Sequence, residues 1–193
     1  MFEQGLLALS GWETLIYTLI LTHISIVSVT IYLHRCMAHR AMDMHPALAH
    51  FFRFWVWFTT STITKEWVSI HRKHHAKCET EDDPHSPVVK GLKTVLLTGA
   101  ELYKEESENK ETLERYSRGC PDDWVERNLY QKYKYAGIFA LLALQIALLG
   151  PIGITVWAIQ MLWMPVHAAG IINGIGHALG YRNFECPDAA TNI

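Results

Sequence analysis

A run of 46 consecutive residues, 136–181, contains no Asp, Glu, Lys or Arg. At about 1.5 Å per residue, a helix of that length extends about 69 Å, enough to cross a hydrocarbon core of roughly 30 Å twice. Gly150-Pro151-Ile152-Gly153 interrupts the run near its middle, where Pro and Gly indicate a turn. The run therefore predicts a helical hairpin of two membrane spans. A buried soluble helix pair is the less favoured alternative, because neither face carries a charge.

Residues 14–33 form a second charge-free stretch and predict one further span. No basic residue precedes Arg35, which places the N-terminus outside and Arg35 on the cytoplasmic side. The same observation excludes a secretory signal peptide. Residues 46–64 are also apolar but include Arg53, which favours an interfacial or re-entrant helix that does not cross.

The charged residues are concentrated between these stretches, and residues 71–135 hold 25 of the 36 in the chain. We therefore expect a polar, helical cytosolic segment there. The fold class is predicted to be an all-α integral membrane domain that covers residues 1–193. The net charge of −2 without a polybasic tract excludes a typical nucleic-acid-binding protein. The four cysteines form no Cys-x-x-Cys pair, which argues against a zinc ribbon and a disulfide framework.

The histidines carry the chemistry, because nine of the 11 lie between His23 and His85. His71, His74 and His75 have offsets of zero, three and four residues, which put three imidazoles on one helical face. Imidazole is a good ligand for iron, zinc, copper and nickel. A basic surface patch with the neighbouring Arg72 and Lys73 is the alternative.

Two further pairs lie near the ends of apolar stretches. His34 and His39 are five residues apart, a rotation of about 140° on a straight α-helix, so their rings are expected to face different directions. They would then serve two neighbouring metals, or lie where the helix frays. Asn173 and His177 end the hairpin, and a metal-binding role there is about even with a helix-capping Asn and a hydrogen-bonded His.

The predicted topology brings these motifs together. If residues 46–64 do not cross the membrane, His34 and His39 share a face with the cluster at residues 71–75. The hairpin then returns Asn173 and His177 to the same face. Six histidines and one asparagine are therefore expected to converge.

In this order, the motifs resemble those of integral-membrane fatty acid desaturases, most closely the acyl-CoA (delta-9 type) branch. The resemblance covers roughly residues 20–193. It rests on His-x4-His, on Glu66-Trp67 before His-x-x-His-His, on Glu79-Thr80-Glu81-Asp82-Asp83-Pro84-His85-Ser86, and on Asn-x3-His before Gly180-Tyr181-Arg182.

The resemblance implies two iron ions held by histidine boxes at the cytoplasmic membrane face, in a bacterial inner membrane or the endoplasmic reticulum. The implied iron ligands are His34, His39, His71, His74, His75 and His177, with Asn173 acting through a bound water. Candidates for orienting these ligands or for lining the substrate tunnel are Glu66, Trp67, Glu79, Asp83 and His85.

The family also has a third His-x-x-His-His box, downstream of Asn-x3-His. This chain stops at Ile193 before such a motif. We therefore expect a truncated sequence, inactive by itself, whose full-length protein is an oxidoreductase. Ile70 stands where the animal acyl-CoA enzymes have an acidic residue, which weakens the inference that coenzyme A is the acyl carrier.

The implied reaction is the O2-dependent insertion of a cis double bond into a long-chain acyl group, carried by coenzyme A or by a membrane lipid. Since the sequence has no haem, flavin or iron–sulfur motif, electrons must come from a donor of the cytochrome b5, ferredoxin or rubredoxin type. Two alternatives stay open. One is a related di-iron hydroxylase or ketolase, and the other is a non-enzymatic membrane protein that binds haem or metal.

Overall fold

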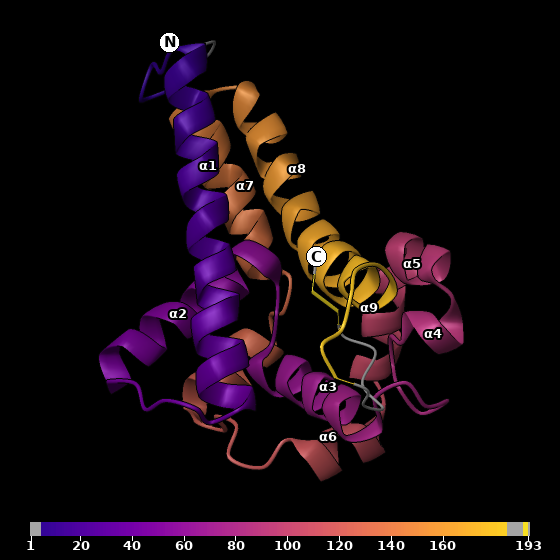
Figure 1. The fold of residues 1–193 in the computed structure, drawn as a ribbon. Coiled ribbons are helices and arrows are strands. Elements are labelled where there is room, and N and C mark those ends of the chain that lie inside the picture. The colour runs from indigo at the N-terminus through magenta and orange to yellow at the C-terminus, as the bar shows by residue number, and fades with distance from the viewer. Residues whose placement is uncertain (1–4, 185–190, 193) are drawn as a thin grey trace. The chain divides into compact units, whose positions relative to one another are not determined.

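A computed structural model describes residues 5–184 and 191–192 of the chain (Figure 1). The described residues form helices and no strand, with one isolated bridge between Tyr181 and Asn192. The all-helical prediction is therefore confirmed. The chain divides into two compact units, 1–64 with 121–163 and 65–120 with 164–193.

The first unit begins with a long apolar helix. Helix α1 (Gly11–Val27) starts at a capping box in which Ser10 and Glu13 satisfy each other's backbone N–H groups. It continues directly into the π-helix η1 (Ser28–Ala38). Among the described residues, Gly11–Ala38 is the one helix that is long and apolar enough to cross a membrane.

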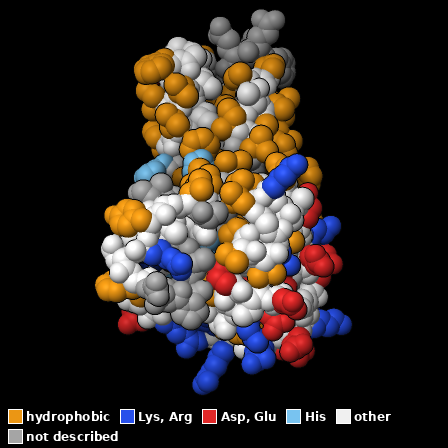
Figure 2. Space-filling model, turned by 45° about the vertical axis from the view of Figure 1, so that its right-hand side comes forward, with side chains coloured by type: hydrophobic (Ala, Val, Ile, Leu, Met, Phe, Trp, Pro, Cys, Tyr) orange, Lys and Arg blue, Asp and Glu red, His pale blue; other side chains and the backbone are white. Residues whose placement is uncertain are grey.

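The expected hairpin is present as two antiparallel helices, α7 (Ala136–Leu149) and α8 (Ile152–Met164), joined at Gly150 and Pro151. Gly150 has a φ of 70°, which glycine adopts without steric cost. Hydrophobic side chains such as Leu19, Phe139 and Ile154 are exposed on α1, α7 and α8, and Figure 2 shows a face of the molecule on which hydrophobic side chains gather. Both helices are shorter than a full span, so the crossing of the membrane twice stays a prediction.

Two contacts hold the hairpin together. A Cβ on Gly153 would lie 2.2 Å from the Gln145 carbonyl oxygen, so only glycine allows the backbones to approach this closely. The Gln145 side chain donates to the Gln160 side chain at 3.2 Å, and both are buried. Such amide pairs link apolar helices that present few other directional contacts.

Helix α2 (Pro46–Thr60) is the apolar segment that contains Arg53. The Arg53 side chain is only 4% exposed, and its guanidinium donates to both carboxylate oxygens of Asp123 at 2.7 and 3.2 Å. The Glu126 carboxylate lies 3.8 Å away, at the start of the π-helix η2 (Glu126–Gln131). Asp123 and Glu126, from the predicted polar segment, therefore pack with α2.

Two further histidines, His45 and His50, make contacts within this unit. The ring of His45 accepts from the Ala47 N–H at the start of α2, and His50 contacts Arg53 at 3.2 Å. His23 is exposed on α1. These contacts need no metal.

The second unit consists of short helices packed around α5 and η3. Arg72 and Lys73, which lie between the histidines of α3, make contacts within this unit. Arg72 donates to the carbonyl oxygens of Tyr116 and Arg118 at 2.8 and 2.9 Å, and Lys73 pairs with Glu106 at 2.8 Å. The alternative of a basic surface patch is therefore wrong for these two side chains. The helices are α3 (Thr64–Lys77), α4 (Pro87–Lys90), α5 (Leu92–Ser107), α6 (Lys110–Tyr116), η3 (Pro165–Ile175) and α9 (Gly176–Ala178).

Substitution of Arg53 tests whether α2 depends on its buried ion pair. Arg53→Leu removes the cation that faces the buried Glu126 carboxylate, and we expect a loss of about 3 kcal/mol in unfolding free energy. Arg127→Leu is the control, because its pair with Asp122 is exposed, and we expect less than about 1 kcal/mol. Unfolding in detergent, followed by tryptophan fluorescence, measures both. Equal losses of unfolding free energy in the two variants would show that the buried ion pair of Arg53 stabilises the fold no more than the exposed pair of Arg127.

Candidate metal centre

His34 and His39 lie side by side, contrary to the expectation from a straight α-helix. Their Nε2 atoms are 3.1 Å apart. The reason is the π-helix, since the His39 N–H donates to the His34 carbonyl five residues earlier at 3.0 Å. Position 39 therefore lies one turn beyond position 34 on the same side of the helix. The expectation that the two rings face apart is wrong.

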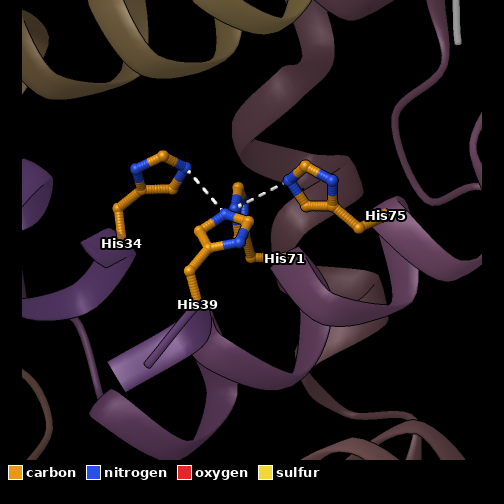
Figure 3. Close-up of side chains that lie close together, drawn as sticks. All are labelled: His34, His39, His71 and His75. Atoms are coloured by element: carbon orange, nitrogen blue, oxygen red, sulfur yellow. Dashed lines mark hydrogen bonds between the residues drawn. The ribbon is translucent and has the colours of Figure 1, made fainter. Parts of the chain in front are cut away.

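Helix α3 presents the second cluster as the spacing predicts. His71 and His75 are one turn apart, with their Nε2 atoms 3.1 Å from each other. The Trp67 ring stacks on the His71 ring at a centroid distance of 4.7 Å, which restricts the rotation of that imidazole. Figure 3 shows the ring nitrogens joined within the His34–His39 pair and within the His71–His75 pair.

The spacing within each pair fits metal ligation. With imidazole–metal bonds of about 2.1 Å, two nitrogens 3.1 Å apart subtend an angle of roughly 95° at one ion. That angle is intermediate between octahedral and tetrahedral values. Each pair can therefore supply two neighbouring ligands to one ion without moving its helix.

His74 differs from its neighbours because a buried carboxylate holds it. Its Nδ1 lies 2.9 Å from both oxygens of Asp83, whose side chain is fully buried. An ionised carboxylate only accepts hydrogen bonds, so Nδ1 must carry the hydrogen. In the neutral ring, the lone pair is then on Nε2. This is the arrangement in which carboxylates fix the tautomer and direction of metal-binding histidines.

Asp83 stays ionised despite its burial. Burial alone raises the pKa of the Asp83 carboxyl group. The hydrogen bond and charge of His74, together with the N–H groups of His85 and Glu79, lower this pKa by more than burial raises it. The net result is a pKa below the ordinary value for Asp. The two backbone donors lie 3.1 and 3.0 Å from the carboxylate.

His85 stacks on His74 with a centroid distance of 4.4 Å. Burial lowers the pKa of His85 to about 4, and repulsion from His74 adds to this effect. The ring is therefore neutral at physiological pH. Its Nε2 is buried and has no hydrogen-bond partner among the described residues.

His177 is held by a second carboxylate. Its Nδ1 lies 3.0 Å from Glu79 Oε1, so the carboxylate fixes the direction of the ring. Glu79 also accepts a hydrogen bond from the Ser86 hydroxyl. Ser86 is the N-cap of α4 and accepts from the N–H groups of Val88 and Val89, so its own hydrogen is directed to Glu79.

Two of these participants were missed in the sequence analysis. Cys78 lies close to two of the candidate ligands, since its Sγ and ring nitrogens of His74 and His177 are all within 4.8 Å of one another. Its position four residues after His74, directly after the end of α3, was the available signal. For Ser86, the signal was a Ser before Pro87, a common start of a helix.

The structure gives less detail on two remaining candidates, Glu66 and Asn173. Glu66 is in the first turn of α3 and is half-buried. Asn173 lies in η3, but its side chain is outside the described part of the structure. Its proposed role through a bound water stays a prediction.

Replacement of Asp83 tests whether it prepares His74 for a metal. Asp83→Asn removes the ionised acceptor, and we expect the affinity for Fe²⁺ or Co²⁺ to fall by about 10- to 100-fold. Asp82→Asn is the matched control, because Asp82 is 65% exposed and pairs only with Lys77 among the described charges. Titration of the purified protein, followed by calorimetry and metal analysis, measures both. Equal affinities in the two variants would contradict the role of Asp83.

Comparison with known proteins identifies the chain's relatives. No protein-family model matches the chain. It is 28% identical over 168 residues to an sn-1 stearoyl-lipid 9-desaturase of Anabaena variabilis, covering 86% of this chain and 59% of the relative. It is 26% identical over 189 residues to a probable chloroplastic lipid desaturase of Arabidopsis thaliana, covering 94% and 50%. It is 27% identical over 173 residues to an acyl-CoA 5-desaturase of Anemone leveillei, covering 86% and 51%.

The chain thus spans between half and three fifths of the length of these relatives. Their names include both acyl-lipid and acyl-CoA desaturases, so the similarity does not select an acyl carrier. The aligned regions include most of this chain and agree with the motif resemblance. The chain is therefore similar, over most of its length, to proteins named as fatty acid desaturases, which are oxidoreductases.

Proposed function

We propose that this chain is the iron-binding part of a membrane fatty acid desaturase that inserts a cis double bond into a long-chain acyl group. The observation that carries the proposal is the hydrogen bond between buried Asp83 and His74. A carboxylate behind an imidazole fixes its tautomer and orients Nε2, and the clustering of several histidines around it favours metal ligation over acid–base catalysis. The desaturase relatives give the reaction class.

The proposed ligands to two irons are the histidines of the boxes, with Asn173 acting through water. The 3.1 Å spacings within the first and second boxes support this assignment, as do the carboxylate partners of His74 and His177. The set consists of His34, His39, His71, His74, His75 and His177.

The irons, when bound, supply the oxidising power that removal of hydrogen from an unactivated methylene requires. The chain's own residues orient the histidine ligands and bind the acyl chain. Asp83 and Glu79 hold Nδ1–H of their histidines, so that each Nε2 keeps its lone pair for the metal. Trp67, stacked on His71, is proposed to shield that imidazole from water and to contact the acyl chain. Ile171 and Ile172 are exposed apolar side chains on η3 that we assign to the acyl-chain path.

The overall reaction requires electrons from another protein. One saturated –CH2–CH2– unit, O2, two electrons and two protons give –CH=CH– and two water molecules. We propose an external donor of the cytochrome b5, ferredoxin or rubredoxin type as the source of the electrons. We also propose that the histidine boxes lie on the cytoplasmic face of the membrane.

The acyl chains of cells that express the complete gene from which this chain comes, rather than residues 1–193 alone, test the function. In a bacterial host supplied with saturated long-chain fatty acids, we expect a cis-unsaturated product by mass spectrometry. His74→Ala removes one proposed ligand, and we expect the product to fall at least 100-fold and the iron content of the purified protein to fall with it. His23→Ala is the control, because His23 is exposed on α1, and we expect both readouts to be retained.

Each other outcome contradicts a specific part of the proposal. A hydroxylated product in place of the alkene would make the protein a di-iron hydroxylase. Full alkene production by the His74→Ala variant would exclude His74 as a ligand. Purified protein with a haem absorption band, or with zinc and no iron, would replace the enzyme by a metal- or haem-binding protein.

A further inference from the structure

Helix α5 changes character at a kink. Thr98 has non-helical backbone angles, with φ of −122° and ψ of 20°, and it divides the helix into two halves. Residues 84–100, which include the first half, contain two lysines and no acidic residue. The second half, from Glu101 to Ser107, contains three acidic residues, and a fourth, Glu108, follows as the C-cap of the helix. The two halves therefore suit different surroundings.

The first half of α5, together with the adjoining helix α4, exposes aliphatic side chains that are not buried in the core of the unit. Leu97 is 69% exposed and Val88, in the adjoining helix α4, is 61% exposed. On the opposite side of the same turns, Val95 is completely buried, and it anchors α5 in its unit. We call the exposed Val88, Val89, Lys93, Leu96 and Leu97, together with the half-buried Lys90, the α4–α5 surface.

We propose that the α4–α5 surface binds the membrane surface, with its aliphatic side chains among the acyl chains and its lysines at anionic headgroups. This inference rests on the membrane location in the proposed function. Aliphatic side chains beside lysines, without acidic residues, are the composition of interfacial helices. Lys90 and Lys93 complement an anionic leaflet, and their flexible stems let the ammonium groups reach the headgroups.

Continuity with other apolar surface supports a lipid over a protein partner. Helix α5 packs against η3, which also exposes Val166, Ile171 and Ile172. η3 belongs to the charge-free run 136–181, which the sequence analysis assigns to the membrane.

Photo-crosslinking in vesicles tests the proposal. A diazirine amino acid is introduced at Leu97, or at Glu105 on the polar half of α5 as the matched control. The full chain is reconstituted in vesicles of zwitterionic phospholipid with about one third anionic phospholipid. We expect at least tenfold more lipid adduct from position 97 than from position 105. Lys90→Gln with Lys93→Gln should lower the adduct at position 97 at least threefold.

A third probe separates this inference from the proposed function. Leu19 is exposed on α1 within the candidate span, so a diazirine there reports whether the chain is in the bilayer at all. Lipid adducts at position 19 without adducts at position 97 would overturn the α4–α5 surface alone. No adducts at either position would overturn the membrane location. An adduct at position 97 to a second copy of the chain, or equal lipid labelling at position 105, would also overturn the inference. None of these readouts needs iron or turnover.

Discussion

The Asp83 carboxylate is the interaction on which the second unit's geometry depends. It is completely buried and ionised, which is costly unless several donors surround it. It receives the Nδ1–H of His74 and the backbone N–H groups of Glu79 and His85. The same bonds that keep the charge buried therefore fold residues 79–85 into a loop and set the direction of His74. Neither the charge nor the loop is stable without the other.

The loop in turn fixes a second histidine. Glu79 follows the end of α3 with a φ of 59°, a left-handed conformation that residues with a side chain seldom adopt. Its N–H is held by Asp83, and its carboxylate contacts Ser86 and His177. Glycine would satisfy this turn at lower cost, but it would leave His177 without its acceptor. The strained residue is therefore the one that connects the loop to the more distant ligand.

The sequence predicted the features that follow from regular helical spacing or from a clear turn signal, and it missed those that depend on the conformation of loops. The offsets of His71, His74 and His75 were sufficient because α3 is a regular helix, and Gly150-Pro151 marked the hairpin turn. The His34–His39 geometry was predicted wrongly, because the choice of π- over α-helical winding depends on packing along Ser28–Ala38 and not on the two residues. The Glu79–His177 contact joins residues 98 positions apart, which spacing alone does not reveal.

Helix α2 shows why hydropathy and membrane crossing must be separated. Its composition is that of a short membrane span. Arg53, near its middle, is nevertheless buried and pairs with Asp123 and Glu126 from the polar segment. An arginine in hydrocarbon has to find such partners, and here they come from a chain segment rich in exposed charge. Such ion pairs are compatible with a helix at the membrane surface. The interfacial position assigned to α2 is therefore favoured by its ion pairs, whereas apolar content alone would have made it a span.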